Sequence, residues 1–184
     1  MRGYFGIGVE GISKPMNFGA VMRTAHAFGA SFAFTVGDAL PAREIGQSDT
    51  SQAAGSLPFY AFRRACDLLL PRGCALVGVE ITEDAIELPS FRHPRRAAYV
   101  LGPERGALSR AMLARCDHVV RIPLGFAINV GLAGALVMYD RMITLGRFAP
   151  RPVTAGGPVE PVPVPEFGPP AWVRKRARSG AAET

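Results

Sequence analysis

Short apolar segments alternate with helical segments along this chain, and glycine or proline separates many of them. We expect strands at residues 4–9, 31–36, 58–62, 75–81, 97–101 and 119–122, and helices at residues 17–28, 63–70, 109–115 and 128–145. The expected strands are rich in Val, Ile, Phe and Leu, as buried strands usually are. This alternation predicts an α/β fold with a mostly parallel sheet and helices on both of its faces.

Local signals mark where several of these helices begin and end. Asn17 is expected to cap the first helix, Gly29 to end it, and Ser109 to cap a shorter helix. The final helix is apolar on nearly every side before Asp140. This pattern indicates burial on more than one side, which a subunit interface would provide.

The composition changes near residue 150. Residues 1–149 are expected to form one folded domain, and residues 150–184 a Pro-rich, basic and disordered tail without a core of its own. Trp172 stands beside four basic residues in this tail, which is expected either to hold RNA backbone or to act as a solubilising end. Residues 37–55 are polar and long for a connection, and loops of this length are often functional.

The chain is strongly basic, with a formal net charge of +6 and a pI of about 9.8. Nearly all of the positive charge is arginine, because lysine occurs only at Lys14 and Lys175. Arginine suits bidentate phosphate contacts, so the charge favours a nucleic-acid partner. A general bias toward arginine on a solvated surface is the alternative.

The cysteines, the histidines and the hydropathy exclude several classes of protein. The three cysteines lack CxxC spacing and the three histidines lack ligand spacing, so we expect ordinary thiols, histidines that are structural or exposed, and no metal. No apolar run approaches the roughly 18 residues of a membrane span, and the N-terminus lacks the pattern of a signal peptide. We therefore expect a cytoplasmic protein with no membrane partner.

The chain also lacks the phosphate loop of nucleotide hydrolases and the common zinc-protease and serine-hydrolase motifs. Polar residues instead gather in three glycine-bearing segments, at residues 17–25, 101–108 and 122–130. The candidates for chemistry in these segments are Asn17, Arg23, Glu104 and Asn129. Ligands of parallel sheets bind at the carboxyl edge of the strands, so the segments predict one site. The alternative is a structural ion pair between Arg23 and Glu104, beside two ordinary turns.

The three segments contain N-x-G-A-x-x-R-T-A, L-G-P-E-R-G-A-L, and I-P-L followed by N-V, in that order. In this combination the chain resembles the SpoU/TrmH family of RNA ribose 2′-O-methyltransferases, of the SPOUT superfamily, over residues 3–147. The resemblance implies that the C-terminal part of the sheet forms a deep trefoil knot. It also implies S-adenosylmethionine held by the knot loops, and a homodimer with the active site near the subunit boundary.

Carried over position by position, the resemblance assigns roles to residues of this chain. Arg23 would hold a neighbouring phosphate and stabilise the developing alkoxide, because an arginine pKa above about 12 makes a poor base. Asn17 would orient Arg23 or the ribose, Glu104 would fix Arg23 or the loops, and Asn129 would brace the knot loops. The expected cofactor-binding residues are Val79, Glu80, Leu101, Gly102, Pro103, Gly106, Ile122, Leu124, Ala127, Ile128 and Leu132.

The chain departs from the family pattern in its third segment. Ala127 replaces the serine that usually precedes Leu-Asn-Val, and the stretch from Ile122 to Asn129 is shorter than usual. A non-catalytic RNA-binding member is therefore one alternative, and a small-molecule methyltransferase is another. Because the chain starts almost at its first strand, we expect no N-terminal RNA-binding domain. Compact relatives of this kind include tRNA-modifying enzymes, so tRNA is the first expected substrate and rRNA the second.

Overall fold

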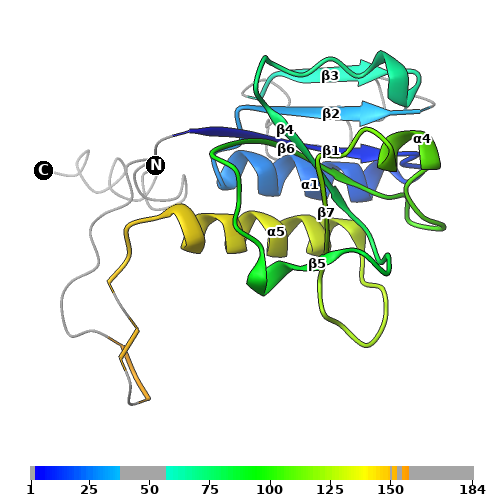
Figure 1. Ribbon diagram of the computed structural model, residues 1–184. Coiled ribbons are helices and arrows are strands. Elements are labelled where there is room, and N and C mark those ends of the chain that lie inside the picture. The colour runs from blue at the N-terminus through cyan, green and yellow to red at the C-terminus, as the bar shows by residue number, and fades with distance from the viewer. Residues whose placement is uncertain (1–2, 38–56, 150, 153–154, 158–184) are drawn as a thin grey trace, which may run out of the picture. The chain divides into compact units, whose positions relative to one another are not determined.

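The computed structural model describes residues 3–37, 57–149, 151–152 and 155–157 (Figure 1). Along the chain the elements are β1 (Tyr4–Glu10), α1 (Pro15–Ala27), β2 (Phe32–Val36), β3 (Phe59–Phe62), β4 (Ala75–Val79), β5 (Ile86–Glu87), β6 (Arg96–Leu101), α4 (Arg110–Leu113), β7 (His118–Arg121) and α5 (Val130–Leu145). The chain divides into two units, Met1–Arg147 and Phe148–Thr184, and all of these elements belong to the first.

The seven strands of the described residues form one sheet in the order β3-β2-β1-β6-β4-β7-β5, and every pairing among them is parallel. The expected mostly parallel α/β sheet is therefore confirmed. In the register, Val9 of β1 pairs with Leu101 of β6, which in turn pairs with Val79 of β4. The carboxyl ends of the three central strands consequently meet at one edge.

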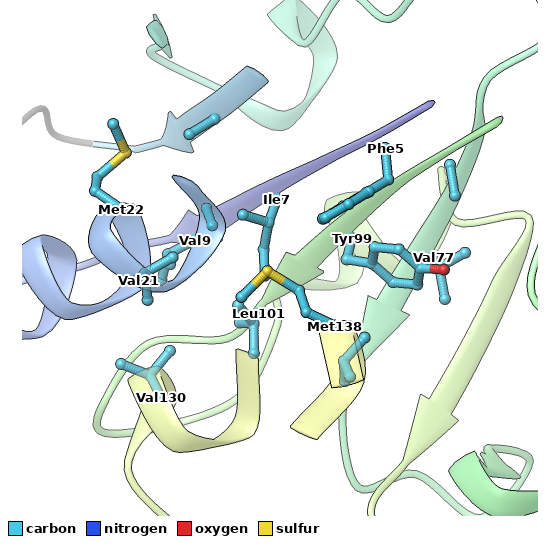
Figure 2. Close-up of a cluster of buried hydrophobic side chains, with 14 of the residues drawn as sticks. Phe5, Ile7, Val9, Val21, Met22, Val77, Tyr99, Leu101, Val130 and Met138 are labelled. Carbon is cyan, nitrogen blue, oxygen red and sulfur yellow. The ribbon is translucent and has the colours of Figure 1, made fainter. Parts of the chain in front are cut away.

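Alternate residues of each central strand face opposite sides of the sheet. On β6, Tyr99 and Leu101 join the core beneath α1 and α5, whereas Ala98 and Val100 join the core beneath α4. Helices α1 and α5 pack together on the first face, where the close-up in Figure 2 shows the side chains of Leu101 and Met138 in one buried cluster. Both faces are covered as expected, although α4 is much shorter than the two helices opposite.

The glycines of β1 have a packing role. Phenyl rings of β2 lie across them, and a Cβ added at Gly8 would come within 2.5 Å of the Phe34 ring. Phe32 crosses Gly6 in the same way. The Gly6-Ile7-Gly8 run is therefore explained by close contact between two neighbouring strands.

A buried arginine ties the last helix to the start of the sheet. Arg141 of α5 is 1% exposed and donates hydrogen bonds to the carbonyl oxygens of Pro94, Arg95 and Tyr4, at 2.5, 2.8 and 3.3 Å. A fourth bond reaches the hydroxyl of Tyr99 at 3.3 Å. These oxygens compensate a charge that would otherwise be costly to bury.

The Tyr99 hydroxyl also links Arg141 to a buried histidine. Its oxygen lies 2.6 Å from Nδ1 of His93, while Nε2 of His93 lies 2.8 Å from a carboxylate oxygen of Asp140. Burial raises the pKa of Tyr99 to about 12, so the phenol stays protonated and its O–H can donate a hydrogen bond to Nδ1 of His93. Burial lowers the pKa of His93 despite the opposing effect of Asp140.

Some local expectations from the sequence are wrong. The helix expected at residues 63–70 is a single 3₁₀ turn (Ala65–Asp67), because the backbone becomes extended at Leu68 (φ −60°, ψ 118°). In this conformation the carbonyl oxygens of Ala65 and Leu68 accept hydrogen bonds from the Arg115 guanidinium. Helix α1 begins at Pro15, so Asn17 lies within its first turn and does not cap it. The two-residue strand β5 was not expected. Residues 38–56 and the tail from 158 onward lie outside the described residues.

Candidate functional site

A pocket of about 380 Å³ lies at the carboxyl edge of the sheet. It is formed by the ends of β4, β6 and β7, the loops that follow them, and the first turns of α1 and α5. The volume is within the range of small-molecule sites. The cofactor-binding residues expected from the sequence that line it are Val79, Glu80, Leu101, Gly102, Pro103, Gly106, Ile122, Leu124, Ala127 and Ile128.

Three of the four catalytic candidates form a hydrogen-bonded chain beside this pocket. Nδ2 of Asn17 donates to Oε1 of Glu104 at 3.1 Å, and Oδ1 of Asn17 accepts from Nδ2 of Asn129 at 3.0 Å. The amide of Asn17 is thereby fixed in one orientation. These hydrogen bonds join residues that lie about 90 to 110 positions apart in sequence, so all three motif segments meet at one place.

Glu104 also holds the start of α1. Its carboxylate accepts hydrogen bonds from the N–H groups of Ser13 and Lys14 and from the Ser13 hydroxyl, each at 3.1 Å. Partial burial opposes ionisation, but the bonds from Asn17 and from these N–H groups lower the pKa of Glu104 overall. Glu104 is therefore an ionised structural anchor of the site at neutral pH.

Asn129 has a second role at the beginning of α5. Its Oδ1 accepts a hydrogen bond from the N–H of Gly131 at 2.8 Å, which makes Asn129 the cap of that helix. A Cβ added at Gly131 would lie 3.2 Å from Cβ of Ala20, so α5 approaches α1 closely at this point. The first turns of both helices are thus fixed at the rim of the pocket.

Two further carboxylates hold the loop after β6. Glu80 accepts the N–H of Leu108 at 2.7 Å, and Glu10 accepts both the N–H and the hydroxyl of Ser109 at 2.7 Å. A Cβ at Gly102 would lie 3.0 Å from Oε2 of Glu80 and 3.3 Å from the backbone nitrogen of Leu108, so a side chain here would crowd the Glu80–Leu108 hydrogen bond. The expected cap of α4 by Ser109 is present, since its hydroxyl accepts the N–H of Met112.

Arg23 and Leu132 do not line the pocket of their own chain. Arg23 is exposed on α1, and the Arg23–Glu104 ion pair considered above is not formed. Six residues of helix separate Asn17 from Arg23, which is a rotation of roughly 240° about the axis and a rise of about 9 Å. Asn17 faces the pocket, so Arg23 must point elsewhere. Leu132 of α5 is likewise turned outward and is 61% exposed.

Several pocket residues were not found from the sequence. Lys14, Arg121 and Phe126 line the pocket together with residues at the start of α5. Lys14 precedes the proline that opens α1, Arg121 ends β7, and Phe126 follows a glycine in the third segment. Their positions, beside the motif segments for Lys14 and Arg121 and within the third segment for Phe126, could have identified them as pocket residues.

Fold and site together define a parallel α/β protein with a ligand pocket at the carboxyl edge of its sheet. Residues 5–139 match the model of the SpoU rRNA Methylase family. The chain belongs to this family, as its three motif segments indicated. No group of three or more potential metal-ligating His, Cys, Asp or Glu residues occurs in the described part of the chain, and no described helix could cross a membrane.

Named relatives act on different RNAs. The chain is 30% identical over 144 residues to the 23S rRNA (guanosine-2′-O-)-methyltransferase RlmB of Nitrosomonas europaea, covering 72% of this chain and 53% of that protein. It is 26% identical over 141 residues to the tRNA (guanosine(18)-2′-O)-methyltransferase of Escherichia coli, covering 72% and 60%. The chain therefore spans little more than half the length of these two relatives.

The fold is also similar to solved structures. An AdoMet-bound rRNA methyltransferase from Sinorhizobium meliloti superimposes with a TM-score of 0.70 at 17% sequence identity, covering 80% of this chain and 59% of that one. At this identity the likeness establishes a shared fold and nothing further about the site.

Proposed function

We propose that this protein transfers a methyl group from S-adenosylmethionine to a ribose 2′-hydroxyl of RNA. One observation carries the proposal: hydrogen bonds join Asn17, Glu104 and Asn129, from three distant motif segments, beside a single pocket. Family membership supports this chemistry, and both relatives described above are named as RNA 2′-O-methyltransferases. The RNA is tRNA or rRNA, since one relative is named for each.

The pocket suits S-adenosylmethionine. Gly102 brings loop backbone to the pocket without a side chain, and Leu101 and Ile122 supply apolar walls. Glu80 and Glu104 place negative charge around a pocket that would receive a positively charged sulfonium. When bound, S-adenosylmethionine supplies a methyl group on positively charged sulfur. Ala127 lines the pocket where the family pattern has serine, so its backbone and methyl group would contact the ligand without a hydroxyl.

The residues of this chain position the reactants. Glu104 and Asn129 hold the Asn17 amide, which orients the ribose at the rim of the pocket. Arg23 pairs with the adjacent phosphate and stabilises the developing alkoxide, because its guanidinium stays charged. The ribose proton passes to a phosphate oxygen or to water. Most of the rate then comes from positioning and charge stabilisation.

Arg23 would act in the pocket of a second copy of the chain. It shares the exposed side of α1 with Met16, which is 80% exposed, and α5 presents a neighbouring exposed stripe. That stripe consists of Leu132, Leu136 and Tyr139, which are 61, 41 and 48% exposed. A homodimer would bury this apolar surface and explain why the final helix is apolar on nearly every side.

Mixing two inactive variants and measuring methyl transfer tests whether Arg23 of one chain acts in the pocket of the other. Arg23→Ala keeps an intact pocket, whereas Asn129→Ala keeps an intact Arg23. In a mixed dimer one of the two sites is complete, so a random mixture should recover about a quarter of the wild-type activity. No recovery, with mixed dimers verified by mass spectrometry, would show that Arg23 does not act across the interface.

Mapping of ribose methylation tests the reaction itself. Total RNA from cells with and without the gene, analysed by mass spectrometry, should differ by one 2′-O-methylated nucleotide. Calorimetry with S-adenosylmethionine is the companion measurement. Binding of the cofactor without any lost modification would contradict the RNA substrate, and no cofactor binding would favour a non-catalytic RNA-binding role.

Two features of the chain's organisation remain part of the proposal. Residues 1–149 would fold without the rest, and residues 150–184 would add basic RNA contacts, which a chain truncated at residue 149 tests. The C-terminal part of the sheet would be knotted, as family membership implies. Tracing the path of α5 through the preceding loops in a crystal structure is the test of that knot.

A further inference from the structure

The mouth of the pocket exposes an aromatic ring. Phe126 lines the pocket and is 80% exposed, and it belongs to the loop that leaves the sheet between β7 and α5 (Figure 1). Leu124 and Ile81 also line the pocket and are 47 and 63% exposed. By contrast, Leu101 and Val130 in the same pocket are 2 and 6% exposed. The pocket thus has a buried interior and an apolar rim open to solvent.

Cationic side chains accompany this rim. Lys14 lines the pocket, and in the described part of the chain its ammonium group has no hydrogen-bond or ion-pair partner. Arg121 lines it too, with one guanidinium nitrogen 3.0 Å from a carboxylate oxygen of Glu87. Glu80 and Glu104, the pocket's carboxylates, already accept hydrogen bonds from backbone N–H groups. In the described part of the chain, Lys14 is thus the pocket-lining cation whose side chain has no carboxylate partner and could meet a phosphate at the rim.

An aromatic ring beside cations matches the chemistry of single-stranded RNA. Nucleobases stack on exposed aromatic side chains, and the neighbouring phosphates pair with lysine or arginine. A cofactor seated inside the pocket would be contacted by the buried apolar residues. Phe126 is left for a ligand that arrives from solvent.

We propose that Phe126 is the stacking platform for the base of the nucleotide whose ribose enters the pocket, with Lys14 pairing with a flanking phosphate. This inference rests on the proposed RNA methyl transfer and names how that substrate is held. It makes Phe126 a substrate-binding residue with little preference among bases, because every base presents a flat face.

Three variants of one position test the platform. Phe126→Ala should weaken binding of a short fluorescent single-stranded RNA by roughly tenfold or more, since stacking on one aromatic residue contributes on that scale. Phe126→Trp should restore affinity to near the wild-type value, whereas Phe126→Leu should restore little. Leu69→Ala is the matched control, because Leu69 is also 80% exposed and does not line the pocket.

Salt dependence separates stacking from charge. Phe126→Ala should leave the slope of affinity against salt unchanged, whereas Lys14→Ala should reduce that slope by about one counterion. S-adenosylmethionine affinity, by calorimetry, and oligomeric state, by light scattering, should not change in Phe126→Ala.

Other outcomes overturn the inference in distinguishable ways. Unchanged RNA affinity in Phe126→Ala refutes the platform while the proposed methyl transfer stands. Weaker binding of S-adenosylmethionine would assign Phe126 to the cofactor, and a change in oligomeric state would assign it to the subunit interface. If the wild-type protein binds neither RNA nor S-adenosylmethionine, the proposed function itself fails.

Discussion

Asn17→Asp is the sharpest test of the hydrogen-bonded chain at the site. Asn17 donates to Glu104 at 3.1 Å and accepts from Asn129 at 3.0 Å. Aspartate has nearly the same shape and keeps the acceptor for Asn129. It loses the donor, however, and places a second carboxylate within hydrogen-bonding distance of Glu104. The substitution therefore changes one interaction and preserves the packing.

The expected loss of stability follows from these contacts. Removing a hydrogen bond to a charged acceptor costs about 1.5–3 kcal/mol. Repulsion between the carboxylates adds to this, but only up to the roughly 3–4 kcal/mol needed to protonate an ordinary carboxyl group at neutral pH. Glu104 is partly exposed, so solvent weakens both effects. We expect the free energy of unfolding to fall by about 2–4 kcal/mol near pH 7.

The stability deficit of Asn17→Asp should depend on pH in a definite direction. In the wild type the pKa of Glu104 is lowered, so its stabilising effect is present above the unfolded-state pKa and disappears as pH falls through the folded-state value. In Asn17→Asp, repulsion raises the pKa of the carboxylate pair. The deficit of the variant should shrink between about pH 7 and 5, because the pair gains a proton that restores a donor.

Urea unfolding at several pH values measures this difference. Asn17→Ala is the control, since it removes the donor without adding charge and should show a deficit that changes little over the same range. If Asn17→Asp and Asn17→Ala change in parallel with pH, the contact between positions 17 and 104 is not the one described here. Methyl transfer by both variants should fall well below the wild type.

Four further predictions concern other parts of the chain. Arg23→Ala should lower methyl transfer by roughly 100-fold or more while the Kd for S-adenosylmethionine stays within about twofold, and near-normal turnover would refute its role. Gly8→Ala should destabilise the fold by about 1–3 kcal/mol in urea unfolding, because its Cβ would overlap the Phe34 ring, and an unchanged midpoint would contradict this packing. Burial lowers the pKa of His93, so the unfolded state binds more protons below about pH 6.5; stability should fall with acidification there, and less steeply in His93→Leu. Truncation after Arg151 should weaken RNA affinity, at one stated salt concentration, more than cofactor affinity; unchanged RNA affinity would make the tail irrelevant to RNA.

The position of the pocket was largely predictable because parallel strands place their carboxyl ends together. Glycine turns after β6 and β7 identified the loops that line the pocket, and Asn17, Glu104 and Asn129 stood out as polar residues in those segments. Their mutual bonding was not predictable, since Glu104 lies 87 residues from Asn17. Local sequence offered Asn17 as a helix cap, but Pro15 fixes the start of α1 earlier and a distant carboxylate binds the Asn17 side chain.

Local helix signals failed where tertiary contacts were stronger. Residues 63–70 have a helical pattern, yet the backbone becomes extended at Leu68 after one turn, and Arg115, from a separate part of the chain, binds the carbonyl oxygens of Ala65 and Leu68 in that conformation. Lys14, Arg121 and Phe126 were missed for a different reason. Lys14 and Arg121 lie just outside the motif segments, and Phe126 lies within the third segment at a position to which the family pattern assigns no role; the folded loops bring all three to the pocket.

Helix geometry places the two polar side chains of the first motif segment, Asn17 and Arg23, on different sides of α1. Asn17 faces its own pocket and is fixed there by Glu104, whereas Arg23 lies roughly 240° further around the same helix. The helix backbone sets the direction of the Cα–Cβ bond at each of the two positions, and Arg23 is exposed and does not line the pocket. In the proposed mechanism, a single chain therefore separates Asn17, which would orient the ribose, from Arg23, which would stabilise its alkoxide. In the proposed homodimer the exposed apolar stripe on α5 would be the surface on which a second chain brings these two groups together, so oligomeric state and activity should be lost together when Leu136 of that stripe is replaced by a charged residue.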